Sequence, residues 1–201
     1  MKWLDALDVS LKLFTWIFYY RLYYKNQVIN LVSEIKFQGL ESLVTVVDTQ
    51  QLQMFSYGRH FAGCFIKTHD GRLLLQQRGV HWDRFPGMLA TFGGQVDSGE
   101  TPLQGMVREL REELGAEIDP SELLFLGAFT KLGLNDALIH AYWWDDRKGS
   151  ISGCYEGDPV YFDSATDVLS QDNITPDVYW IAHRCLELGL LSSPHNKGVV
   201  V

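Results

Sequence analysis

The feature that most constrains the fold of this chain is a helix between Thr101 and Gly115 whose two ends are both encoded. Thr101 is a typical N-cap residue, Pro102 suits the first helical position, and Gln104 completes a capping box. Gly115 is the residue type that most often ends a helix. A core-facing apolar stripe runs along this helix and consists of Leu103, Met106, Val107, Leu110 and Leu114.

Three glutamates lie beside that stripe. Glu109, Glu112 and Glu113 have i, i+3, i+4 spacing and therefore share one side of the helix. A solvated acidic face is the usual explanation for a run of acidic residues. Three carboxylates at the edge of a core also match the oxygen ligands that Mg²⁺ requires. The helix alone leaves both interpretations open.

The flanking residues extend this pattern in both directions. From Gly94 to Ala116 the chain has the spacing G-x5-E-x7-R-E-U-x-E-E-x-G-U, in which U is an aliphatic residue. This pattern resembles the signature box of the Nudix hydrolases, a far more specific match than a lone glycine motif. Ala116 is smaller than usual, and Phe92 stands where many members have proline, but neither departure changes a charged group. The resemblance covers roughly residues 58–193.

The resemblance implies an α/β (α+β) Nudix fold, in which a mixed β-sheet is sandwiched between α-helices. The residue pattern agrees, since a hairpin signal, His69-Asp70-Gly71, and alternating apolar runs indicate strands after His60. We expect strands over 61–67, 72–77, 88–92, 123–130, 137–144 and 160–162, and helices over 165–169 and from Thr175 to near Gly189. We expect the Nudix hydrolase domain over 56–201 and an N-terminal helical extension over 1–55.

The resemblance also implies an activity, namely Mg²⁺-dependent cleavage of a diphosphate linkage in a nucleoside diphosphate derivative, with Mn²⁺ as a possible substitute. Glu109, Glu112 and Glu113 correspond to the family's metal ligands. Arg108 would orient the glutamates, and Glu100 would brace the preceding loop by accepting hydrogen bonds. Glu109, Glu112, Arg108 and Glu100 therefore form the expected catalytic set.

Further site residues come from the loops around the box. Gly93 and Gly94 allow the backbone to approach a phosphate, and Arg78 could bind the same substrate group. The general base varies within the family, so Glu109, Glu112 or a carboxylate of a later loop could serve. Glu156 is the candidate for that later carboxylate and for a fourth metal ligand; an ordinary exposed loop acid is an equal alternative.

Several other side chains have a structural role as the favoured interpretation. Core packing is favoured over stacking on a nucleobase for a set of aromatic residues that comprises Trp82, Phe85, Tyr142, Trp144 and Tyr155. A hydrogen-bonded core position is favoured for His140, and buried free thiols are favoured for Cys64, Cys154 and Cys185.

The substrate is defined mainly by elimination. Members that cleave ADP-ribose often carry a proline beyond the box, and none occurs between Ser121 and Trp144. A normal or oxidised nucleoside triphosphate, (d)NTP, is therefore the first expectation, with a nucleotide sugar or ADP-ribose next. The rival from another class is a catalytically silent, nucleotide-sensing Nudix domain. The complete set of glutamates favours the enzyme.

The composition of the chain limits the binding partners and the cellular location that we expect for it. The net charge is −8, with 17 Lys+Arg against 25 Asp+Glu, so we do not expect a surface that coats nucleic acid. The scattered cysteines suggest a reducing, cytoplasmic setting. The longest apolar run near the N-terminus, 13–20, is too short for a transmembrane segment, and Asp5 and Asp8 argue against an export signal.

The N-terminal extension contains a helical apolar stripe made of Leu4, Leu7, Leu11, Phe14, Phe18 and Leu22. Such a helix must be covered by the rest of the chain, by a second copy or by a membrane surface. Its polar face lacks the Lys/Arg enrichment of membrane-surface helices. We therefore favour a homodimer to which this segment contributes. We also expect a second helix over 27–37 and a strand over 43–47.

Overall fold

The computed structural model describes residues 44–47, 57–131 and 136–191. The helices expected over 4–22 and 27–37 lie outside these residues, and so does the first residue of the strand expected over 43–47. Within the described ranges, no helix is long and apolar enough to cross a membrane.

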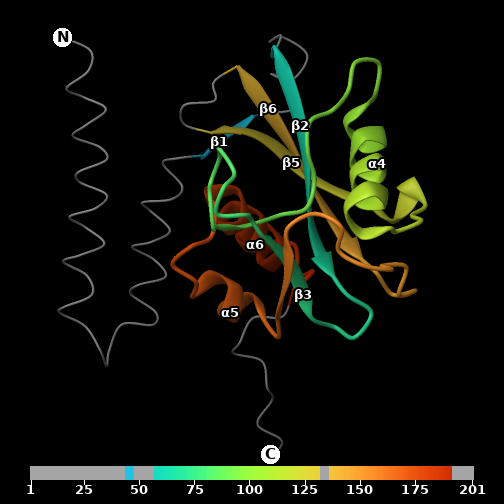
Figure 1. Ribbon diagram of the computed structural model, residues 1–201, viewed down its shortest axis with the longest axis vertical. Coiled ribbons are helices and arrows are strands. Elements are labelled where there is room, and N and C mark those ends of the chain that lie inside the picture. Colours follow the sequence, from blue (N-terminus) through green and yellow to red (C-terminus); the bar gives the residue numbers. More distant parts are fainter. Residues whose placement is uncertain (1–43, 48–56, 132–135, 192–201) are drawn as a thin grey trace, which may run out of the picture. The chain divides into compact units, whose positions relative to one another are not determined.

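The centre of the fold is one β-sheet, with seven strands in the described part of the chain (Figure 1). Its order is β1 (Val44–Val47), β5 (Leu124–Lys131), β6 (Ala137–Asp145), β2 (Arg59–Lys67), β3 (Leu73–Gln77) and β4 (Leu89–Ala90), and β7 (Asp158–Phe162) also pairs with β3. The long central pair β2 and β6 is parallel, from Arg59 beside Ala137 to Lys67 beside Asp145, and the other pairs are antiparallel. The sheet is therefore mixed, as expected.

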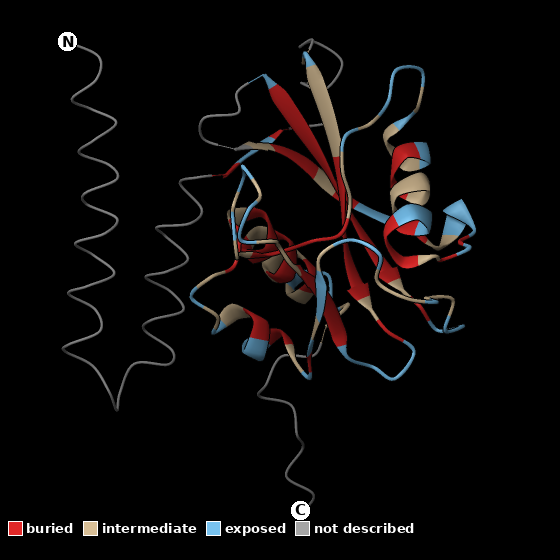
Figure 2. Cartoon of the chain, viewed as in Figure 1, coloured by how far each residue is buried: buried red, intermediate tan, exposed pale blue. Residues whose placement is uncertain are grey.

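Helices cover both faces of this sheet (Figure 1). Helix α4 (Pro102–Leu114) packs on one face, and α5 (Ala165–Leu169) and α6 (Pro176–Glu187) pack on the other. Side chains alternate along β2, so that Cys64 and Ile66 face α4 whereas Phe65 faces α6. Most of β2, β3 and β6 and the inner sides of the helices are buried (Figure 2). This arrangement confirms the α+β class and the sheet between helices.

The ends of α4 follow the local sequence. Thr101 accepts a hydrogen bond from the Gln104 amide, and the Gln104 side chain accepts one from the Thr101 amide. Gly115 ends the helix in the left-handed conformation, with φ +59°. Met106, Leu110 and Leu114 of the predicted stripe are fully buried, and Leu103 and Val107 pack at its edge. Each fully buried side chain of this kind contributes about 1.5–3 kcal/mol to stability.

Three local expectations are corrected. The strand expected over 88–92 is only two residues long, because the backbone of Phe92 pairs with Cys64 of another strand. Thr175 occupies the N-cap position of α6, but its buried hydroxyl makes no hydrogen bond within the described structure. A short 3₁₀ helix, η1 (Pro120–Glu122), precedes β5 where no helix was expected.

Candidate metal and phosphate site

The candidate site lies where the Nudix-like box meets the ends of the central strands. Helix α4 supplies the three glutamates, and the loop after β4 supplies Gly93 and Gly94. The two segments are joined directly, since the Gly93 amide donates a 2.7 Å hydrogen bond to Glu113 Oε2. The end of β3 and the loop that contains Glu156 border the same carboxylates.

Arg108 holds most of the acidic groups together. Its Nε and Nη2 donate to the two oxygens of Glu100, at 3.0 and 3.2 Å. Its Nη1 donates to Glu109 at 2.9 Å and to Glu112 at 3.1 Å. Glu100 first, and then Glu109, raise the pKa of the Arg108 guanidinium above its usual range. One cation therefore offsets the repulsion between neighbouring acidic side chains on α4.

Glu100 connects the loop to the helix. Besides its two bonds from Arg108, it accepts a 3.1 Å hydrogen bond from the Asp97 amide. Arg108 in turn donates from Nη2 to the carbonyl of Gln95, at 2.9 Å. The pKa of Glu100 is lowered, first by Arg108 and then by the Asp97 amide. The structure thus brings Glu100 and Arg108 into contact, with the loop fixed by both.

Glu113 is the most deeply buried of the acids, with 3% of its surface exposed. Burial raises its pKa to about 8, and the negative charges of Glu156 and Glu109 add to this effect. The hydrogen bond from the Gly93 amide opposes the shift but does not cancel it. The described residues around Glu113 therefore supply too little positive charge to offset the cost of burying its carboxylate.

Glu109 shares this environment, whereas Glu112 does not. The side chain of Glu109 is 14% exposed, and burial raises its pKa against the opposing effect of Arg108. The side chain of Glu112 is 59% exposed, and within the described residues Arg108 is its hydrogen-bond partner. The three glutamates therefore range from buried to solvated along one side of α4.

The two glycines of the loop are required for different reasons. Gly93 has φ +131°, and a Cβ there would lie 2.2 Å from the carbonyl oxygen of Ala62. A Cβ on Gly94 would lie 2.5 Å from Glu109 Oε1. Gly93 therefore allows the backbone to pack on β2, and Gly94 leaves the space that the Glu109 carboxylate occupies.

Gln76 belongs to the site and was not among the residues expected from the sequence. It lies in the buried strand β3 and is 2% exposed. Its Nε2 donates to the carbonyl of Glu156 at 3.0 Å and makes a long, 3.5 Å bond to Glu113 Oε1. Gln76 thus joins the Glu156 loop to the buried carboxylate. The only available signal was an amide side chain directly after three consecutive leucines.

Glu156 and Arg78 lie within electrostatic range of the same carboxylates. Glu156 is exposed, and its charge raises the pKa of Glu113 and of Glu109. Burial lowers the pKa of the Arg78 guanidinium, while the charges of Asp177, Glu156 and Glu113 oppose this shift. The structure therefore places both sequence-predicted residues around Glu113, one of each sign.

The residues present fit a divalent cation with oxygen ligands. Glu113 and Glu109 carry charge that burial penalises, and a bound cation would offset that penalty. Within the described ranges, no three acidic, histidine or cysteine side chains already surround a single point. Arg108 Nη1 is bonded to both Glu109 and Glu112, so these two carboxylates are directed toward the guanidinium.

Among the aromatic and histidine side chains considered in the sequence, some are buried in the core and Tyr155 is exposed. Tyr142 and Trp144 are buried in the core, and His140 is buried with its Nε2 3.1 Å from Nδ1 of His60, as the favoured interpretation had it. Tyr155 is 67% exposed and does not pack in the core.

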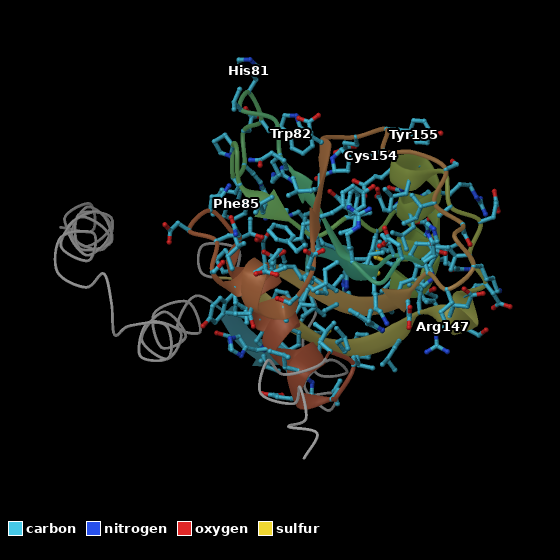
Figure 3. All side chains as sticks on the ribbon, turned by 90° about the horizontal axis from the view of Figure 1, so that it is seen from below. His81, Trp82, Phe85, Arg147, Cys154 and Tyr155 are labelled. Atoms are coloured by element: carbon cyan, nitrogen blue, oxygen red, sulfur yellow. The ribbon has the colours of Figure 1, made fainter. Side chains whose placement is uncertain are left out.

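Cys64 and Cys185 are buried, but Cys154 is partly exposed, so the expectation of three buried thiols is wrong for one of them. Cys154 and Tyr155 lie together on the loop near α4 (Figure 3).

Comparisons with known proteins identify the same family as the residue pattern of the box. A family profile described as "NUDIX domain" matches residues 59–178. The chain is 37% identical over 79 residues to a CTP pyrophosphohydrolase from Escherichia coli K12, an alignment that covers 39% of this chain and 56% of the relative. It is 35% identical over 92 residues to the nucleoside triphosphatase NudI of Escherichia coli O139:H28, covering 46% and 61%. The chain thus spans less than two thirds of the length of each of these relatives.

A solved structure shares the fold at low sequence identity. It is a bifunctional NMN adenylyltransferase/ADP ribose pyrophosphatase from Francisella tularensis, which aligns with a TM-score of 0.50 and 15% identity. The alignment covers 78% of this chain and 46% of that one. Since the family profile matches more than half of the chain and contains the whole glutamate site, this protein belongs to the Nudix family.

Proposed function

We propose that this protein is a divalent-metal-dependent pyrophosphohydrolase that cleaves a phosphoanhydride bond of a nucleoside triphosphate. The observation that carries this proposal is the pair formed by buried Glu113 and partly buried Glu109 beside the Gly93-Gly94 backbone. Buried carboxylates with raised pKa values suit a cation, and a polyphosphate is the substrate that such a cation binds. A nucleotide sugar or ADP-ribose is the second substrate class.

Each residue then has a defined task. Glu109, Glu112 and Glu113 would hold Mg²⁺, or Mn²⁺ in its place, with Glu156 as a further oxygen donor. The bound cation would polarise the phosphate and lower the pKa of the attacking water. Arg108 keeps the carboxylates of Glu109 and Glu112 in place by hydrogen bonds from Nη1.

The loop residues complete the arrangement. Glu100 fixes the loop to α4 through Arg108, and Gly94 leaves room for the Glu109 carboxylate. Arg78 would bind phosphate oxygens from the opposite side with its guanidinium. The proton of the attacking water would pass to a carboxylate oxygen of Glu109, Glu112 or Glu156.

The names of two relatives support a nucleoside triphosphate as substrate. One is a CTP pyrophosphohydrolase and the other a nucleoside triphosphatase. Both alignments cover only part of either chain, so the substrate is proposed at the level of class. The proposal covers triphosphates with a normal base and those with an oxidised base.

The proposal is tested by phosphate and pyrophosphate release from a panel of normal and oxidised (d)NTPs, nucleotide sugars and ADP-ribose. We expect Mg²⁺-dependent release from a triphosphate, loss of activity in EDTA, and recovery with Mg²⁺ or Mn²⁺. Full activity after exhaustive chelation would contradict the metal-dependent mechanism. Tight nucleotide binding without hydrolysis of any compound would favour the sensing domain instead. The dimer, the domain boundary at residue 56 and the cytoplasmic location stay predictions from the sequence.

A further inference from the structure

The loop from Gly79 to Gly87, between β3 and β4, is closely organised. The Trp82 amide donates to the Gly79 carbonyl at 3.2 Å and forms a tight turn. At the other end, the carbonyl of Gly87 accepts hydrogen bonds from the side chains of Gln77 and Asn173. Figure 3 shows His81 at the outer end of this loop and Trp82 closer to the body of the molecule. The loop therefore presents the Trp82 ring at a defined place.

The Trp82 ring lies under the guanidinium of Arg78. Arg78 Cζ is 4.4 Å from the ring centroid, which is within the range of a cation–π interaction. A Cβ on Gly79 would lie 2.7 Å from Trp82 Nε1, so the ring packs directly on the Cα of this glycine. The turn and the missing side chain at residue 79 together permit the stack.

A second contact fixes the rotation of the guanidinium. Arg78 Nε donates a 2.9 Å hydrogen bond to the carbonyl of Arg84, on the same loop. Among the residues that the structure describes, the two Nη groups have no acceptor. Arg78 lies two residues after Gln76, just beyond the end of β3, and the charges of Asp177, Glu156 and Glu113 act on its guanidinium. Both Nη groups are thus available as a fork for phosphate oxygens.

We propose that Trp82 is a positioning residue that acts through Arg78. Its ring supports one face of the guanidinium, while the Arg84 carbonyl holds Nε, so that the Nη groups are set for a phosphate before the substrate arrives. This role deepens the proposed function and rests on it. A preorganised guanidinium binds its anion with less loss of side-chain entropy than a free one.

The test compares Trp82→Phe and Trp82→Leu in the full-length chain, each with and without Arg78→Met. We expect Trp82→Leu to raise KM, and the Kd of a non-hydrolysable nucleoside triphosphate analogue, by about fivefold, with kcat changed less than about twofold. Trp82→Phe keeps an aromatic face and should lose about half of this effect or less. In the Arg78→Met background, Trp82→Leu should have no further effect on KM or Kd. Val80→Ala, at an exposed position of the same loop, is the matched control.

A measurement without ligand separates this proposal from the proposed function. In NMR spectra of the metal-free protein, ring current from Trp82 should shift the Arg78 side-chain resonances upfield. This shift should persist in Trp82→Phe and vanish in Trp82→Leu, even if no nucleotide proves to be a substrate. An unshifted Arg78 in the unsubstituted protein would overturn the proposal. So would equal losses of affinity from Trp82→Leu with and without Arg78, because Trp82 would then contact the ligand itself.

Discussion

The substitution Glu113→Gln separates the effect of this carboxylate on the free energy of unfolding from its effect on metal binding and turnover. Glu113 is 3% exposed, and burial raises its pKa from 4.5 to about 8 in the metal-free protein. A pKa raised from 4.5 to about 8 corresponds to about 5 kcal/mol of unfavourable ionisation. An acid whose pKa is higher in the folded state retains its proton better there. Stability therefore falls as the pH rises from 4.5 to 8 and stays low above that range.

Glutamine has nearly the same shape as glutamate and can still accept the hydrogen bond from the Gly93 amide. In EDTA at pH 8.5, we expect Glu113→Gln to raise the free energy of unfolding by up to about 5 kcal/mol, and at pH 4.5 to change it little. With Mg²⁺ present, the unsubstituted protein should gain stability and the variant should gain less. Turnover should fall by about 100-fold or more, since one ligand charge is lost.

Urea unfolding at both pH values, with EDTA or Mg²⁺, measures these effects directly. Glu117→Gln is the matched control, because the side chain of Glu117 is 79% exposed and, within the described residues, pairs with Arg111 at the surface. It should alter neither the pH dependence nor the activity. A Glu113→Gln variant that is less stable than the parent at pH 8.5 in EDTA would refute the argument from burial. Near-normal turnover would remove Glu113 from the site.

Three further predictions test other parts of the chain. Gly93→Ala should unfold the protein at lower urea than Gly94→Ala, because its Cβ would meet a backbone oxygen, whereas Gly94→Ala should chiefly reduce activity by displacing Glu109. Burial lowers the pKa of His140 to about 4, so the contribution of His140 to stability should be complete above pH 6.5 and fall by about 3 kcal/mol toward pH 4. In urea titrations, His140→Gln should reduce this loss. Deletion of residues 1–24 should shift the mass in light scattering from dimer to monomer while metal-dependent activity remains; an unchanged mass and unchanged heat stability would contradict this covering role.

The elements that could be predicted from the sequence are those with local signals. The capping box at Thr101 and Gln104 and the glycine at residue 115 define α4 because each acts within a few residues along the chain. The Asp70-Gly71 turn similarly defined the hairpin between β2 and β3, where Gly71 has φ +88°. The length of β4 was misjudged, because it depends on pairing with distant strands.

The parts of the site that could not be predicted depend on contacts between distant segments. Helical spacing placed Glu113 beside the apolar stripe, but its burial results from the loop at Gly93, which is 20 positions away in the sequence. Gln76 reaches both Glu113 and the Glu156 loop only because β3 ends beside them. No periodicity in the sequence reports such a contact, since it is produced by the packing of the sheet against α4.

Arg108 explains how a helix tolerates three acidic residues on one side without a cation bound. Its guanidinium is bonded to Glu109 and Glu112 through Nη1, and Nε and Nη2 are bonded to Glu100. Glu113 receives no such bond and depends on a backbone amide, and its pKa is raised to about 8. Arg108 therefore offsets the negative charge of the more accessible acids, Glu109 and Glu112, whereas the charge of the most buried acid, Glu113, is offset less. The undercompensated position is where a cation would lower the free energy most, because an uncompensated charge is most costly where water is excluded.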